Sequence, residues 1–328
     1  MNSFSTSLRI VLIFIETSSD AHNSQPSFRD LLECHGLLGT HRSLPSHHNI
    51  AILEHDPSNW LDTIAVHGQP SIVGNLASPA NFARFQMHKL LPILDSVAVY
   101  VDCDMIFHSS IKPLLREASM FVTGSNATHT KFEDPENTGG LGRGDFRPSE
   151  AQKFLLSAVP RSKPVYGDFF SERVQNMFLA RYGKILDVAS PTFNAGLYIV
   201  NLDLWRMKHI QVDVAHWMGA NKQEELWSFG SQPILLLLAA AHGWTTLDRR
   251  WNVDGLGYKA AEDIPLLDSA WGLHWSGVGK PWQTDGPHRQ LWLAFFREAC
   301  SGRGVCKSGG GCKCTELEFQ GPLCGSGS

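Results

Sequence analysis

Three short segments of the chain combine residue types that do chemistry together. The first is Asp102-Cys103-Asp104, which follows the apolar run 97–101. Side chains alternate along a strand, so both carboxylates are expected on one side and the thiol on the other. Carboxylates this close repel each other unless a cation neutralises them, and Mg²⁺ and Mn²⁺ prefer oxygen ligands that they share with substrate phosphates. The pair therefore predicts a divalent metal site, although aspartates also occur where a strand simply runs into a turn.

The second segment, from His274 to Trp282, contains an imidazole, two glycines, a lysine and two indoles. A histidine can complete a metal site that carboxylates begin, and Lys280 supplies a positive charge for a phosphate. Gly277 and Gly279 allow the backbone to approach a ligand closely. The alternative interpretation is a tryptophan-rich edge of the core with a glycine turn.

The third segment, 191–201, places Asn194 and Ala195 ahead of an apolar strand. An amide at the mouth of a strand can bind the hydroxyl groups of a ligand. An ordinary turn that leads from a loop into a strand is the alternative.

Apolar runs predict the elements that position these segments. Residues 8–15 form a run suited to a buried first strand, and residues 82–91 predict a helix that ends near Pro92, ahead of a strand at 97–101. The run Ile234–Ala241, after Pro233, predicts a buried helix. A helix followed by a buried strand indicates an α/β fold with a mainly parallel sheet, in which ligands bind at the carboxyl edge. The glycine-rich stretch 131–149 predicts a surface loop.

Composition limits the classes of partner. The chain has 328 residues, of which 43% are apolar, and 28 basic against 32 acidic residues give a net charge of −4. High apolar content with low net charge excludes disorder as the main description. An acidic chain without a basic patch argues against nucleic acid as a partner. The apolar runs are shorter than the roughly 18 residues that a membrane span needs, so none is expected within this chain.

Taken in order along the chain, these segments resemble those of family 8 glycosyltransferases. Further matching blocks are Phe82-Ala83-Arg84-Phe85, Arg250-Trp251-Asn252 and Gly255-Leu256-Gly257-Tyr258. The resemblance spans about residues 8–295 and is closest to the eukaryotic galacturonosyltransferase-like and glycosyltransferase-8-domain-containing groups. It implies a GT-A fold, in which a Rossmann-like sheet continues into an acceptor-binding part.

The same resemblance implies roles for the polar residues of the first two segments. Asp102, Asp104 and His274 match the metal ligands of the family. Gly277 and Lys280 match the residues that hold the diphosphate of the donor. The implied cofactor is Mn²⁺, or Mg²⁺ in its place, and the implied donor is a UDP-sugar.

Four more residues match the part of the family site that holds the donor sugar. Arg84 and Asn194 match donor-sugar contacts, with Ala195 packed beside them, and Gln232 matches a glutamine near the anomeric carbon. Gln232 and Asn194 are therefore the expected catalytic residues. The implied reaction is retaining transfer of a hexosyl group (galacturonosyl, galactosyl or glucosyl) to a glycan or glycoprotein acceptor.

Two departures from the family pattern motivate a second hypothesis. Ser231 stands where bacterial members carry an acidic residue, and the stretch Glu16–Asp20 does not align securely with the uridine-contacting stretch of the family. The alternative function is a catalytically silent GT-A domain that binds glycans or protein partners.

Five of the seven cysteines lie between Cys300 and Cys324, and we place a domain boundary near residue 298, so that 1–298 form the catalytic domain and 299–328 a tail. The spacing lacks the paired C-x2–4-C pattern of zinc sites, which favours disulfides over a zinc-binding tail. The tail resembles the C-terminal part of an EGF-like module. That resemblance implies the pairs Cys314–Cys324 and Cys300–Cys312, with Cys306 left over.

The expected location follows from the cysteines and from the glycosylation sequon that begins at Asn126. Both favour the Golgi or secretory lumen. The apolar run Ile10–Ile15 is too short for a convincing signal peptide and no clear cleavage site follows it, so we expect that the sequence is truncated at its start.

Overall fold

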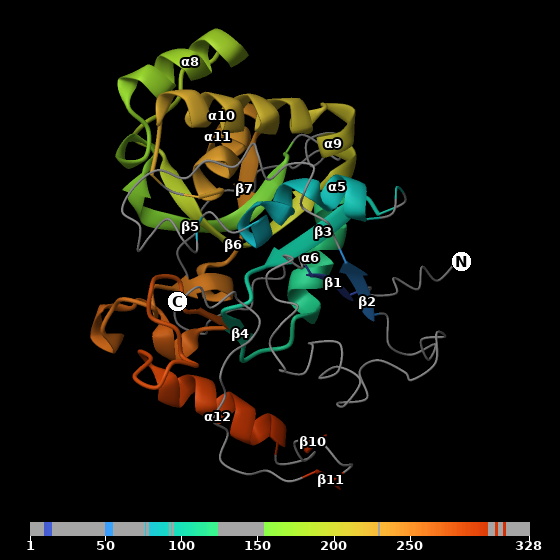
Figure 1. Ribbon diagram of the computed structural model, residues 1–328, viewed down its shortest axis with the longest axis vertical. Helices are drawn as coiled ribbons and strands as arrows, with labels where there is room; N and C mark the ends of the chain where they lie inside the picture. Colours follow the sequence, from blue (N-terminus) through green and yellow to red (C-terminus); the bar gives the residue numbers. More distant parts are fainter. Residues whose placement is uncertain are drawn as a thin grey trace, which may run out of the picture.

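A computed structural model provides the structure of the chain, shown in Figure 1. It describes residues 10–14, 50–54, 76, 79–91, 93, 95–123, 154–228, 230–300, 306–307 and 311–312. The expected loop at 131–149, the sequon, the stretch 16–20 and most of the cysteine-rich tail lie outside the described residues.

The core is built on a four-stranded sheet in the order β3-β6-β5-β7. Its strands are β3 (Val97–Val101), β6 (Pro191–Asn201), β5 (Leu156–Val165) and β7 (Trp244–Thr246). A long apolar strand can occupy the centre of a sheet, and ten of the eleven residues of β6 are buried. Asn194 lies within this strand, not ahead of it as the sequence suggested.

The sheet is mixed, which differs from the expectation of a mainly parallel sheet. β6 runs antiparallel to both β3 and β5, and only the pair β5–β7 is parallel. A strand covered on both faces produces a continuous apolar run whichever direction its neighbours take, so the sequence pattern cannot distinguish the two arrangements. The α/β class is confirmed.

Helices cover this sheet in layers, as Figure 1 shows with α11 next to the sheet and α10 and α8 beyond it. The helices are α8 (Glu172–Tyr182), α9 (Leu202–Met207), α10 (Ile210–Glu224) and α11 (Gln232–His242). The predicted buried helix is α11, whose residues from Pro233 to Ala239 are all buried, with proline in the first turn.

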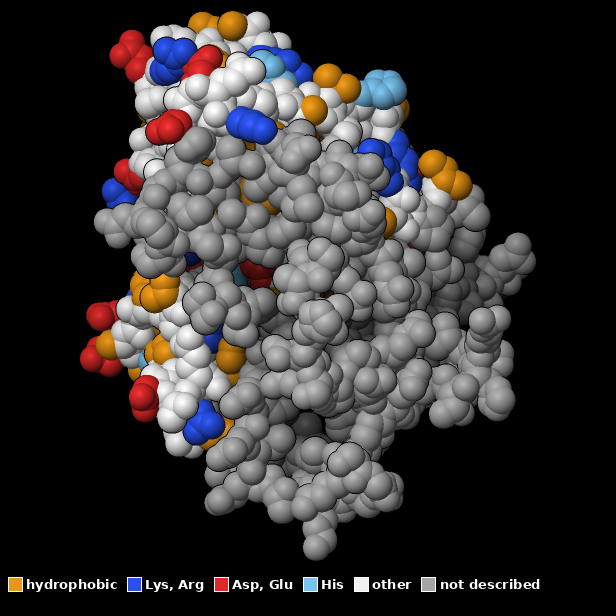
Figure 2. All heavy atoms as spheres, viewed as in Figure 1, with side chains coloured by type: hydrophobic (Ala, Val, Ile, Leu, Met, Phe, Trp, Pro, Cys, Tyr) orange, Lys and Arg blue, Asp and Glu red, His pale blue; other side chains and the backbone are white. Residues whose placement is uncertain are grey.

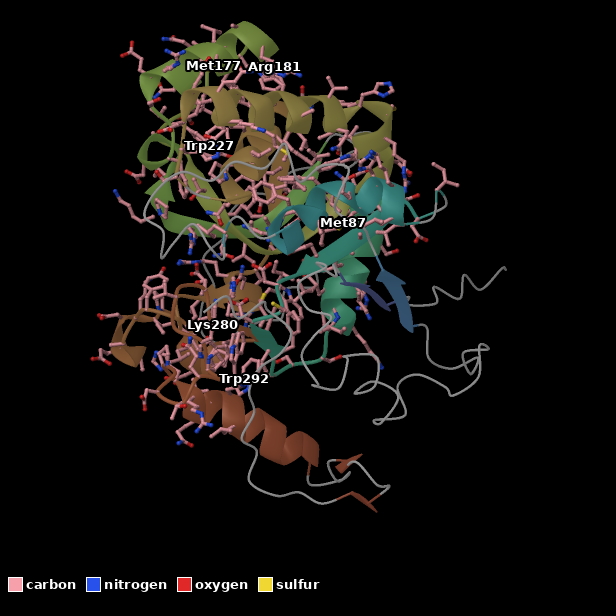
Figure 3. All side chains as sticks on the ribbon, in the orientation of Figure 1. Met87, Met177, Arg181, Trp227, Lys280 and Trp292 are labelled. Atoms are coloured by element: carbon pink, nitrogen blue, oxygen red, sulfur yellow. The ribbon has the colours of Figure 1, made fainter. Side chains whose placement is uncertain are left out.

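One carboxylate joins three of these helices. Asp213 on α10 accepts a hydrogen bond of 2.8 Å from Nε of Arg181 on α8 and lies 2.7 Å from Nε2 of His242 on α11. Burial alone would raise the pKa of Asp213, but the hydrogen bonds and charges of the other two residues hold that pKa below its ordinary value. Figure 3 labels Arg181 on the outermost helix, far from Lys280.

A second, three-stranded sheet in the order β4-β9-β8 lies below the first. It contains β4 (Met105–Phe107), β9 (Gly272–His274) and β8 (Val253–Asp254). β9 pairs antiparallel with β4 and parallel with β8. Trp275 and Trp292 pack edge to face at 5.4 Å and tie this sheet to α12, which runs from Arg289 to Cys300 and so continues past the expected boundary near residue 298.

Shorter elements complete the described chain. The region expected as one helix consists of three successive turns that end before Pro92, namely α4 (Pro79–Phe82), η2 (Ala83–Gln86) and α5 (Met87–Leu90). α6 (Lys112–Thr123) follows β4. The remaining helical turns are η3 (Tyr166–Asp168), η4 (Arg249–Asn252), η5 (Ala261–Asp263) and η6 (Leu267–Ser269).

Two further strand pairs lie near the ends of the sequence. The expected first strand, β1 (Ile10–Phe14), pairs parallel with β2 (Ile50–Glu54), and β10 (Cys306–Lys307) pairs antiparallel with β11 (Gly311–Cys312). Within the described part of the chain, no helix is both long and apolar enough to cross a membrane.

Candidate active site

Asp102, Asp104 and His274 come together where the two sheets meet. Each offers one ligand atom, and the three atoms lie within 4.8 Å of one another. The aspartates occupy the turn between β3 and β4, directly after the strand in which alternation was expected. The pairing of β4 with β9 places Met105 opposite His274, so the imidazole lies beside this turn. Figure 2 shows acidic and histidine side chains at the bottom of a hollow between the upper and lower parts of the molecule.

Asp102 is held by one oxygen and faces His274 with the other. Oδ1 accepts hydrogen bonds from the hydroxyl of Tyr100 at 2.8 Å and from Nη2 of Arg84 at 3.1 Å. Oδ2 lies 3.8 Å from Nε2 of His274. The side chain is 27% exposed, so it is the member of the group most open to a ligand.

Asp104 has the same division between its oxygens. Oδ2 accepts a hydrogen bond of 2.6 Å from Nζ of Lys280, and Oδ1 lies 3.2 Å from Nε2 of His274. Burial would raise the pKa of Asp104, but the imidazole and the ammonium group outweigh it and hold the pKa well below its ordinary value. Asp104 is therefore an anion at neutral pH.

His274 is also held on one side only. Its Nδ1 lies 3.0 Å from Oδ1 of Asn252, and the ring is almost completely buried. Nε2 is therefore the nitrogen that faces the two carboxylates. Each of the three side chains has one polar atom fixed by surrounding groups and a second atom directed at a common point, where Nε2 of His274 and Oδ1 of Asp104 now contact each other. Metal ligands are oriented in this way. Two carboxylate oxygens and one imidazole nitrogen fit Mn²⁺ or Mg²⁺.

Two glycines make room for this arrangement. A Cβ on Gly196 would lie 2.2 Å from Cε1 of His274, so only glycine fits at this point of β6. The carbonyl of Gly196 also accepts a hydrogen bond of 2.7 Å from the backbone N–H of Asp102. Gly277 has a φ of +117°, a conformation that other residues rarely adopt, and its Cα faces the ring of Tyr258.

Lys280, the lysine of the second segment, lies at the site beside Asp104. Besides Asp104, its Nζ donates to the carbonyl oxygen of Trp275 at 2.9 Å. Figure 3 shows Lys280 in the lower part of the molecule, between α12 and the central sheet. The side chain is 22% exposed, so its charge is accessible to an anion beside the metal ligands.

The residues expected to contact the donor sugar differ in what they still offer. Oε1 of Gln232 accepts the backbone N–H of Ala195 at 3.2 Å, while its Nε2 has no hydrogen-bond partner within the described residues. Oδ1 of Asn194 accepts the N–H of Gly196 at 2.7 Å and Nδ2 of Asn252 at 3.3 Å, so both of its lone pairs are used. Gln232 therefore has two free N–H groups, and Asn194 has at most one.

Arg84 lies beneath the site. Its side chain is 4% exposed, and it donates to the carbonyl of Ala195 at 2.8 Å as well as to Asp102. Its guanidinium also packs on the ring of Tyr100, 4.3 Å from the centroid. These contacts orient Asp102 and the backbone of β6, so any action of Arg84 on a sugar is indirect.

Sequence reasoning missed three residues of the site. Asn252 stands in a block that matches the family, but no role was assigned to it. Asp254 and Arg161 carried no signal, because neither stands in a matched motif and they are 93 residues apart. In the structure these two form an ion pair, and Oδ2 of Asp254 accepts a hydrogen bond of 3.3 Å from Asn194.

Known proteins with similar sequences carry the same domain. The profile of glycosyl transferase family 8 matches residues 72–286. Glycosyltransferase 8 domain-containing protein 1 of Danio rerio is 26% identical over 254 residues, which cover 75% of this chain and 62% of that protein. Probable galacturonosyltransferase-like 3 of Arabidopsis thaliana is 28% identical over 237 residues, which cover 69% of this chain and 58% of that protein. The chain thus spans less than two thirds of the length of either relative.

Solved structures agree on the fold. An active-site mutant of LgtC aligns with a TM-score of 0.50 and 15% identity, and the alignment covers 92% of this chain and 98% of that chain. This likeness confirms the expected GT-A type of α/β fold. Because the family profile matches well over half of the sequence, the chain belongs to glycosyl transferase family 8.

Proposed function

We propose that the chain is a metal-dependent hexosyltransferase that uses a nucleoside-diphosphate sugar as donor. The observation that carries this proposal is the convergence of three oriented ligand atoms, from Asp102, Asp104 and His274, beside the ammonium group of Lys280. Carboxylate and imidazole ligands next to a partly exposed ammonium group suit a divalent cation together with the diphosphate that it neutralises.

The residues divide the chemistry between the two ends of the donor. When a divalent cation is bound, it supplies Lewis-acid stabilisation of the negative charge on the leaving diphosphate. Lys280 adds a second positive charge at the same end, fixed in place before the reaction. At the sugar end, the free N–H groups of Gln232 and the remaining N–H of Asn194 are positioned to hold sugar oxygens.

Retention of the anomeric configuration is part of the proposal. Gln232 presents an amide, which is a weak nucleophile, so we propose that no enzyme side chain attacks the sugar. Such a reaction does not need the paired carboxylates of a retaining glycosidase. Delivery of the acceptor oxygen to the face that the diphosphate leaves, with the departing phosphate taking the proton, accounts for retention without an enzyme nucleophile.

We also propose a class of donor, a class of acceptor and a cellular compartment. A relative named probable galacturonosyltransferase-like 3 supports a hexosyl donor, and we propose that the hexosyl group is carried by UDP. A glycan or a glycoprotein is the proposed acceptor. Cys103 is disulfide-bonded, which favours an oxidising compartment, and we place the protein in the Golgi or secretory lumen.

A donor screen tests the proposal. Purified protein is incubated with UDP-glucose, UDP-galactose and UDP-galacturonic acid, with Mn²⁺ or with EDTA, and release of UDP is measured with and without glycan acceptors. We expect release from at least one donor with Mn²⁺ and none with EDTA. Release that persists in EDTA would contradict the metal role, and absence of release from every donor would favour the silent domain.

A further inference from the structure

We propose that Asp254, held by Arg161, is a positioning residue for the metal site, because it fixes the amides that orient His274. This inference rests on the proposed function only in taking His274 as a metal ligand. The basis is a continuous chain of hydrogen bonds from Arg161 on β5 to the imidazole. In order, the links join Arg161 to Asp254, Asp254 to Asn194, Asn194 to Asn252, and Asn252 to His274.

The side-chain amide of Asn194 contacts one group that can only donate a hydrogen bond and one group that can only accept. The backbone N–H of Gly196 can only donate, and it lies 2.7 Å from Oδ1 of Asn194. The carboxylate of Asp254 can only accept, and its Oδ2 lies 3.3 Å from Nδ2 of Asn194. Together they set which end of the amide is oxygen and which is nitrogen.

That orientation passes to the next amide. Because Oδ1 of Asn194 is an acceptor, Asn252 must turn its Nδ2 toward it, at 3.3 Å. Oδ1 of Asn252 then faces Nδ1 of His274 at 3.0 Å and requires a donor there. Nδ1 carries a hydrogen, so Nε2 is the ring nitrogen that can offer a lone pair to a metal, which would replace the present contact between Nε2 and Oδ1 of Asp104.

Burial makes this order of donors and acceptors matter. Asn194 is 7% exposed, Asn252 is 5% and His274 is 2%, so water competes little for their hydrogen bonds. Loss of the acceptor at residue 254 would leave a buried N–H of Asn194 without a partner and allow both amides to turn. Arg161 keeps the carboxylate of Asp254 in place, since both side chains are 17% exposed and the pair lies between β5 and β8.

The test compares two variants that remove the same charge. Asp254→Asn keeps an oxygen that can accept from both Asn194 and Arg161, whereas Asp254→Leu keeps no acceptor. Affinity for Mn²⁺ alone is measured on the full chain by calorimetry, with thermal unfolding as a check of folding. We expect Asp254→Leu to bind Mn²⁺ about 10-fold more weakly than Asp254→Asn, the lower end of losses seen for residues that orient metal ligands. Equal affinities in the two variants would overturn the inference.

A second pair of variants keeps the test decisive where the leucine variant does not fold. Arg161→Met removes a positive charge, which by Coulomb attraction alone would strengthen cation binding. The positioning role predicts weaker Mn²⁺ binding in Arg161→Met, with recovery in Arg161→Lys, and stronger binding in Arg161→Met would refute it. A wild-type chain that binds no Mn²⁺ would instead defeat the proposed function, and the inference with it.

Discussion

Substitution of Gly196 by alanine tests the geometry of the metal site more sharply than removal of a ligand does. The new Cβ would lie 2.2 Å from Cε1 and 2.7 Å from Nδ1 of His274, and 2.8 Å from Oδ1 of Asn194. Ordinary contacts of a Cβ begin at 3.4 Å, so the imidazole must retreat by about 1.2 Å, the difference between the two values. The ring is 2% exposed and held by Asn252, so it cannot retreat without leaving its position opposite the aspartates.

The expected result has two parts. Overpacking of this kind costs about 1–3 kcal/mol of unfolding free energy. Because metal ligation tolerates only about 0.2 Å in the ligand distance, we also expect loss of Mn²⁺ affinity by at least ~100-fold. Chemical denaturation and calorimetry with Mn²⁺ measure the two effects separately.

Gly219 provides the matched control. It lies in α10, and a Cβ there would meet nothing within 4 Å. Gly219→Ala should leave Mn²⁺ binding unchanged and raise the unfolding free energy by about 0.5–1 kcal/mol, since alanine favours a helix over glycine. Wild-type Mn²⁺ affinity in Gly196→Ala would refute the assignment of His274 as a ligand in this geometry.

Three further predictions concern the ligands, the donor and the helical layer. Asp104→Asn should lower sugar transfer by ~10²-fold or more, because it removes half of the carboxylate charge that holds the cation, and the rate with saturating donor measures this. Lys280→Ala should weaken binding of UDP and of UDP-sugar alike, whereas Gln232→Ala should spare UDP affinity and reduce transfer. Calorimetry and a transfer assay separate the two effects. Unchanged UDP affinity in Lys280→Ala would mean that the segment from His274 to Trp282 has only a structural role. Asp213→Asn should reduce the loss of unfolding free energy that the chain shows as the pH falls. A carboxylate with a lowered pKa contributes stability above its ordinary pKa and loses that contribution as the pH falls through the lowered value. Unfolding by denaturant at pH 3 and pH 7 tests this, and an unchanged difference between the two pH values would count against it.

The polar segments of the site could be predicted from sequence because each is short and local. Asp102 and Asp104 stand two residues apart, and His274 and Lys280 stand six apart, so their types and order are visible without a fold. The resemblance to the family then supplied the pairing between segments that are far apart in the chain. The structure brings all four together.

Other features could not be predicted, for two physical reasons. Strand direction leaves no trace in an apolar run that is covered on both faces, so the mixed sheet was mistaken for a mainly parallel one. Buried polar networks are formed by residues that meet only in the folded chain, and Arg161 and Asp254 look like ordinary surface charges in the sequence. The sequence also cannot show which side-chain N–H groups already have hydrogen-bond partners. The structure distinguishes Gln232, whose two side-chain N–H groups have no partner within the described residues, from Asn194, which has at most one such group left.

The most direct test of the central claim is a calorimetric titration of UDP into the full chain, performed once with Mn²⁺ and once with EDTA. The claim is that Asp102, Asp104 and His274 hold a cation that, with Lys280, binds the diphosphate of the donor. We predict saturable binding of UDP with Mn²⁺ and a loss of at least ~10-fold in affinity with EDTA, because the cation carries most of the charge that attracts the diphosphate. Equal affinity in the two titrations, or no binding in either, would contradict the account.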